Sequence, residues 1–142
     1  MNENTLYFYE CEDGLLEINV DYQKTHPLTA RQLFENLLLR EMTTLKGRID
    51  ALRKLFSFAY NVPVYINPAM VFFKVSGKER LWVNGANVAT IKNRTGKGII
   101  IFKCGILLAT DKNYRTLKNA YEKILMISVD KNDLFSDQDL YF

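Results

Sequence analysis

The sequence predicts an α+β domain in which helices pack against a mainly antiparallel β-sheet. Apolar residues recur at helical spacing between positions 33 and 56 and again between 114 and 124. Short β-rich runs separated by turn residues occupy most of the chain from 62 to 108. The chain has 142 residues, of which 48% are hydrophobic and 13% aromatic, which is enough for one domain with a buried core.

The N-terminal segment predicts a β-hairpin. Residues 6–9 and 16–20 are rich in β-forming side chains, and the second run alternates apolar and polar positions. The turn-forming sequence Glu12-Asp13-Gly14 separates the two runs. We therefore expect two antiparallel strands that begin the chain.

Two helices are expected next. Thr29 and Gln32 have the spacing of a capping box, which predicts a helix that starts at Thr29. Apolar residues continue at helical spacing as far as Phe56. Gly47 interrupts this run, and we expect the break between the two helices at that glycine.

About six short strands are expected after the helices. Their β-rich runs lie at residues 62–66, 71–75, 81–83, 88–91, 98–102 and 106–108. Two of the intervening segments have the composition of hairpin turns: the basic loop at residues 93–97 and the tight turn at Cys104-Gly105.

The last expected element is a helix that starts near Asp111 and presents one face of apolar and aromatic residues at positions 114, 117, 121 and 124. The sequence from 130 to 142 contains four aspartates and lacks this pattern. We expect residues 1–129 to form a single domain and residues 130–142 to form an acidic, mobile tail.

Charge is distributed unevenly within a net charge of +3. Residues 1–27 carry six acidic side chains and one lysine, a net charge of −5, and residues 129–142 carry four acidic side chains and one lysine, a net charge of −3. Residues 28–128 carry 17 Lys or Arg and six acidic side chains, a net charge of +11. The strongly basic central segment, residues 28–128, favours a polyanionic partner. The alternative is a solvent-exposed surface on which the charges are unevenly distributed without a functional role.

Several classes of protein are disfavoured. No apolar stretch reaches about 18 residues, as a membrane-spanning helix requires, and the acidic first 20 residues are unlike a signal peptide. We therefore expect a cytoplasmic protein without a membrane partner. His26 is the only histidine, and Cys11 and Cys104 form no CxxC pair, so no metal site and no disulfide is expected.

No constellation of catalytic residues stands out, and we expect neither enzymatic activity nor a cofactor. Gly96-Lys97-Gly98 resembles part of a phosphate-binding P-loop, but Ile91 and Gly98 stand where that motif has Gly and Ser/Thr, and a strand follows. Nothing in the sequence brings Cys11 and His26 together as nucleophile and base.

Cations interleaved with aromatic residues are the candidate functional feature. A basic hairpin beside a basic helix can contact DNA phosphates or enter the minor groove, where arginine favours narrow A·T tracts. Phe72, Phe73 and Trp82 are core residues in the alternative interpretation. The candidate DNA-binding residues are Arg48, Arg53, Lys54, Lys78, Arg80, Lys92, Arg94 and Lys97.

A series of motifs between about Pro27 and Met126 resembles a known family. The motifs are Gly47-Arg48 at a helical stretch, the Pro-containing run from Val62 to Pro68, Phe72-Phe73 followed by Ser76, Leu81-Trp82-Val83, the hairpin from Phe102 to Gly105, and Tyr114 at a helix start. In order and spacing they are similar to the motifs of the ComK family of competence transcription factors. Lys74-Val75 stands where the family has Pro-Thr, and Cys104 stands where it has Asn, so the chain resembles a short or divergent member.

The resemblance implies a transcriptional activator that binds A/T-rich double-stranded DNA through the minor groove. It also implies a homo-oligomer, association with the nucleoid and control by an adaptor that directs proteolysis. Of the matching residues, Arg48 is the expected phosphate contact, and the glycines and aromatic residues are expected to be structural. The alternative function is a protein-interaction module that has lost DNA binding. In that case the acidic terminal segments cover the basic central segment, residues 28–128.

Overall fold

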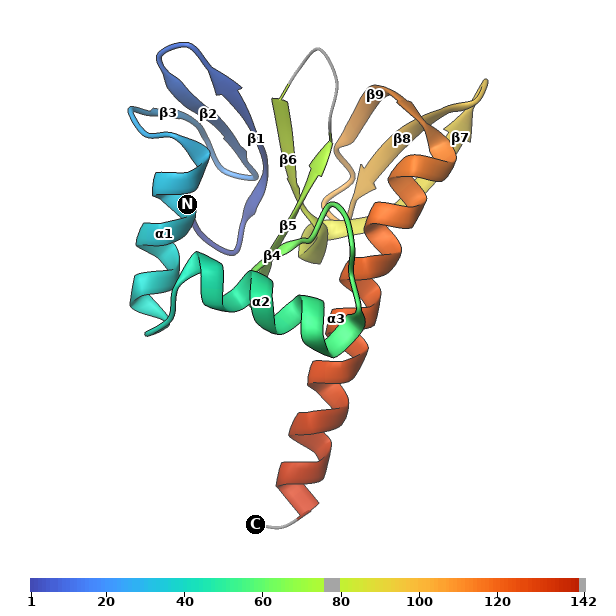
Figure 1. Ribbon diagram of the computed structural model, residues 1–142. Helices are drawn as coiled ribbons and strands as arrows, with labels where there is room; N and C mark the ends of the chain where they lie inside the picture. Colours follow the sequence, from blue (N-terminus) through green and yellow to red (C-terminus); the bar gives the residue numbers. More distant parts are fainter. Residues whose placement is uncertain (76–79, 141–142) are drawn as a thin grey trace.

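Nine β-strands, three α-helices and one short 3-10 helix make up residues 1–75 and 80–140, the part of the chain that the computed structural model describes (Figure 1). Side chains within this part are described as far as Val129. In chain order the elements are β1 (Thr5–Cys11), β2 (Gly14–Asn19), β3 (Gln23–His26), α1 (Ala30–Arg40), α2 (Leu45–Phe56), β4 (Val64–Asn67), β5 (Met70–Val75), β6 (Arg80–Asn84), the 3-10 helix η1 (Gly85–Asn87), β7 (Val88–Arg94), β8 (Lys97–Phe102), β9 (Leu107–Asn113) and α3 (Tyr114–Leu140). The predicted α+β class, N-terminal hairpin and C-terminal helix are confirmed.

The strands form two antiparallel sheets. The larger has the order β3-β2-β1-β6-β5-β4, and the smaller has the order β7-β8-β9. β1 lies between β2 and β6, with Tyr7 opposite Val83 and Phe8 opposite Trp82. The N-terminal hairpin therefore forms one half of the larger sheet, and the six strands expected after the helices are β4 to β9 within the described residues.

Both faces of the six-stranded sheet are covered. α1 lies on one face, where the Phe34 ring packs against Phe8 and Phe72 at centroid distances of 5.7 and 5.5 Å. On the other face α3 and the three-stranded sheet enclose a second core that contains Phe73 and Phe102. Because successive side chains of a strand point to opposite faces, Phe72 and Phe73 enter different cores. This explains why β5 is an almost continuous apolar run.

Helix capping determines where α1 and α2 begin. The Thr29 hydroxyl accepts a hydrogen bond from the Gln32 backbone N–H, and the Gln32 side chain accepts one from the Thr29 N–H, so the predicted capping box is confirmed. The break between the helices lies near Met42, whose φ is 56°, and α2 begins after Thr44. The expected break at Gly47 is wrong, because Gly47 lies in the first turn of α2 and donates its N–H to the Thr44 hydroxyl.

Two further elements differ from the prediction. The sequence does not predict β3, because Gln-Lys-Thr-His contains no apolar residue; this edge strand forms by backbone pairing with β2. Asp111 belongs to β9 and not to the start of the last helix. Helix α3 begins at Tyr114, and the Asn113 side chain accepts a hydrogen bond from the Arg115 N–H.

The C-terminal helix passes the position at which we expect the acidic tail to begin. Its backbone is helical as far as Leu140. Side chains from Asp130 onward lie outside the described part, so the domain boundary at 129/130 and the mobile tail stay predictions. Within the described residues, no helix combines the length and the apolar composition that crossing a membrane requires.

Candidate nucleic-acid interface

The β7–β8 hairpin ends in a two-residue turn flanked by two cations. Arg94 ends β7, Lys97 begins β8, and the two residues are register partners. Thr95 and Gly96 between them have φ values of 51° and 88°, as in the type I′ turns of tight hairpins. The Asn93 side-chain oxygen accepts a 2.8 Å hydrogen bond from the Gly96 N–H. The turn is thus held by its own backbone and by Asn93, and it presents Arg94 and Lys97 at the tip.

The first turns of α3 lie against this tip. The Tyr114 N–H donates a 3.0 Å hydrogen bond to the Gly96 carbonyl oxygen. Arg115 and Lys118 of α3, together with Asn93 and Gly96 of the hairpin, line an open hollow of about 460 Å³. The hairpin tip and the start of α3 therefore form one surface.

Five cations of the hairpin tip and of the first turns of α3 form what we call the hairpin cluster. Its members are Lys92, Arg94, Lys97, Arg115 and Lys118, all exposed. Those of the hairpin lie on the face opposite to that of Gly98, which faces Leu117 of α3. None of the five takes part in an ion pair with an acidic side chain among the described residues. Arg94 and Lys97 stand directly opposite one another, an arrangement of like charges that destabilises a β-ladder. A bound anion would relieve this repulsion.

The candidate residues on α2 lie elsewhere. Arg48 is half-buried, and its guanidinium carbon lies 5.0 Å from the centre of the Tyr65 ring. Burial raises the pKa of Tyr65 even though the Arg48 charge acts to lower it. Arg53 and Lys54 lie in the last turn of α2 and are exposed. Arg48 thus makes a cation–π contact within the fold, whereas Arg53 and Lys54 are open to a ligand.

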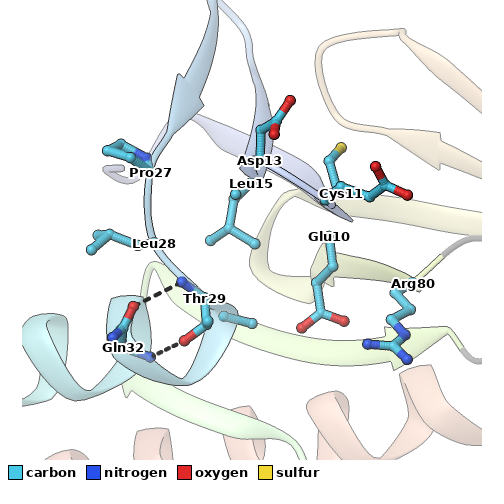
Figure 2. Close-up of a pocket in the computed structure, with 12 residues that line it drawn as sticks. Glu10, Cys11, Asp13, Leu15, Pro27, Leu28, Thr29, Gln32 and Arg80 are labelled. Atoms are coloured by element: carbon cyan, nitrogen blue, oxygen red, sulfur yellow. Dashed lines mark hydrogen bonds between the residues drawn. The ribbon is translucent and has the colours of Figure 1, made fainter.

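Arg80 lies in acidic surroundings. It is the register partner of Glu10 on the neighbouring strand β1. Figure 2 shows the side chains of Glu10 and Arg80 extending in the same direction from these strands, at a hollow of about 310 Å³ that Glu12 and Asp13 also line. The acidic side chains of Glu10, Glu12 and Asp13 at this hollow repel phosphate. Arg80 is therefore less suited to DNA contact than the hairpin cluster. Lys78, also a candidate, lies outside the described residues.

The basic helix beside the hairpin is α3 and not α2. Figure 1 shows the first turns of α3 next to the tip of the β7–β8 hairpin at the top right, whereas α2 lies lower and further to the left, away from the tip. The cations of α2 therefore do not lie beside those of the hairpin, and DNA contact by Arg48, Arg53 and Lys54 stays a prediction. Arg115 and Lys118 were missed because only the tertiary contact between Tyr114 and Gly96 brings the start of α3 to the tip.

Comparison with known proteins gives no match to a family model, to a curated protein or to a solved structure.

Proposed function

We propose that this protein is a transcriptional regulator of the ComK type that binds A/T-rich double-stranded DNA through the hairpin cluster. The observation that carries the proposal is the pair Arg94 and Lys97, which face each other across a two-residue turn without an acidic partner among the described residues. The homo-oligomer, the proteolysis adaptor and the nucleoid association implied by the family resemblance are part of the proposal.

The shape of the tip suits the minor groove. A two-stranded ribbon fits the major groove, which is about 12 Å wide, but the minor groove, about 6 Å wide, admits only side chains from the tip. The Arg94 guanidinium is weakly hydrated and is attracted to the negative potential of narrow A-tract grooves. Lys92 and Lys97 belong to the same hairpin, and Arg115 and Lys118 belong to the first turns of the adjacent α3. All four are available for phosphates, which position the protein without reading sequence.

The test is a pair of binding titrations that follow the fluorescence anisotropy of labelled A/T-rich and G/C-rich duplexes. We expect the wild type to favour the A/T-rich duplex and Arg94→Ala to reduce this preference by about 1–3 kcal/mol, the value of a good base contact. Lys103→Ala is the matched control, because Lys103 is an exposed cation beyond the opposite end of β8.

Melting curves of both variants exclude misfolding as the cause of a change. An A/T preference that survives Arg94→Ala would show that another element reads the DNA. The absence of any binding at low salt would contradict the proposal and favour the protein-interaction alternative.

A further inference from the structure

A second candidate site lies between α1, α2 and the six-stranded sheet. It is a cleft of about 530 Å³. Its apolar lining consists of Ala30, Phe34, Leu45, Ile49, Val62, Val64 and Trp82. A volume of this size with a largely apolar wall and a few polar groups is typical of small-molecule binding sites.

The indole of Trp82 is held rigidly at this cleft. It packs edge-on against Phe34, with ring centroids 4.9 Å apart, and stacks on Phe8 at 6.2 Å. Its Nε1–H is buried and has no hydrogen-bond acceptor among the described residues. Buried indole N–H groups normally have a partner, so this donor is unsatisfied inside the described part of the fold. Because it is closed off from solvent, the indole offers the cleft its aromatic surface and not a hydrogen-bond donor.

Positive charge predominates around the cleft. Lys46 and Arg53 of α2 line it and form no ion pair within the described residues. Arg31 also lines it and pairs with Glu35 at 3.1 Å. Lys74 is not a lining residue but lies nearby, with its Nζ 5.5 Å from the centre of the Trp82 ring.

The acidic side chains at the cleft are fewer. Asp50 and Glu10 line it. Glu10 has the cation Arg80 as its register partner on the neighbouring strand. The excess of cations makes the surroundings of the cleft complementary to an anion.

We infer that this cleft binds a small amphipathic anion. An aromatic or branched apolar body lies against Phe34, Ile49 and Trp82, and a single carboxylate or similar group faces Lys46 and Arg53. The inference is independent of DNA binding, since the hairpin cluster belongs to other elements.

The test uses Trp82 as its reporter, because it is the only tryptophan of the chain. The full-length protein is titrated with anilinonaphthalene sulfonate, an aromatic anion, and with the uncharged N-phenylnaphthylamine. We expect saturable quenching of the Trp82 emission by the anion and weaker binding of the uncharged probe. Ile49→Gln should abolish the quenching, whereas Leu55→Gln, on the same helix but 66% exposed, should leave it unchanged.

Arg53→Gln is a second variant that removes only an exposed charge. We expect it to weaken binding of the anion about fivefold, the value of an exposed charge contact of roughly 1 kcal/mol, and to leave the uncharged probe unaffected. Equal binding of the anion to Ile49→Gln and Leu55→Gln, or no quenching in the wild type, would overturn the inference. If light scattering shows a wild-type oligomer that Ile49→Gln alone dissociates, the cleft is an interface between copies, and the small-ligand inference is wrong.

Discussion

Among single residues, Glu17 is a fully buried carboxylate that ties the N-terminal strands together. It accepts a 2.5 Å hydrogen bond from the Thr5 hydroxyl, and its other oxygen lies 2.7 Å from Nε2 of His26. Burial raises the pKa of Glu17, but hydrogen bonds from Thr5, His26 and Asn19, with the N-terminal ammonium, outweigh this effect and lower the pKa below its usual value of 4.5. The ionised carboxylate is therefore the form that the fold stabilises.

The stability of the protein should depend on the ionisation of Glu17. A folded-state pKa below the unfolded value means that this residue stabilises the fold above about pH 4.5 and that its contribution disappears as the pH falls through the folded-state pKa. We expect Glu17→Gln to lower the free energy of unfolding by about 2 kcal/mol at pH 7. Urea denaturation between pH 3 and 7 measures both effects.

The control for this prediction is Glu12→Gln, which changes an exposed glutamate in the turn of the same hairpin. Its free energy of unfolding should follow that of the wild type at every pH. If Glu17→Gln retains the wild-type loss of stability on acidification, other carboxylates cause that loss.

Among the secondary-structure elements, α3 depends on two glycines for its close approach to the sheets. A Cβ atom at Gly98 of β8 would lie 2.3 Å from Cδ1 of Leu117, and one at Gly85 of η1 would lie 2.7 Å from Cγ2 of Ile124. Leu117 and Ile124 are both buried in the core between α3 and the sheets. Because Gly98 and Gly85 have no side chain, α3 can pack closely on β8 and η1. This packing brings Arg115 and Lys118 to the hairpin tip.

Gly98→Ala should force the Leu117 side chain of α3 away from its position against β8. We expect a loss of about 1–3 kcal/mol in the free energy of unfolding, as for other overpacked cores. The matched comparison is the same substitution in a Leu117→Ala background, where the new methyl group has room. There the added cost of Gly98→Ala should be much smaller, and equal costs in the two backgrounds would show that contact with Leu117 is not the cause.

For the molecule as a whole, the position of its cations determines how salt affects the proposed DNA binding. Four cations of the hairpin cluster besides Arg94 are available for phosphates, so contacts to about four phosphates give a slope near −3.6 for the logarithm of affinity against the logarithm of salt concentration. Lys97→Ala should reduce the magnitude of this slope by about 0.9, whereas Lys54→Ala, on the distant α2, should leave it unchanged. Anisotropy titrations at several salt concentrations measure these slopes, and equal effects of the two substitutions would place α2 on the DNA as well.

Local sequence patterns predict much of the fold and part of the candidate site. The capping box at Thr29 and the hairpin tip at Arg94 and Lys97 depend on residues close together in the chain, and both are confirmed. β3 could not be predicted in this way, because its four residues are polar and only pairing with β2 makes them a strand. The position of Gly47 also gives a wrong prediction for the break between the two helices, because the Thr44 cap determines where α2 begins.

The sequence by itself determined the fold class, the order of most elements and the two cations at the turn. Each of these follows from spacing, capping and turn chemistry within a few residues. Only the tertiary structure decided which helix accompanies the basic hairpin. The Gly96–Tyr114 hydrogen bond and the contact between Gly98 and Leu117 place α3 there, whereas α2 lies beside β4. Such contacts join residues far apart in the chain and depend on the space between packed surfaces, which no local pattern of residues encodes.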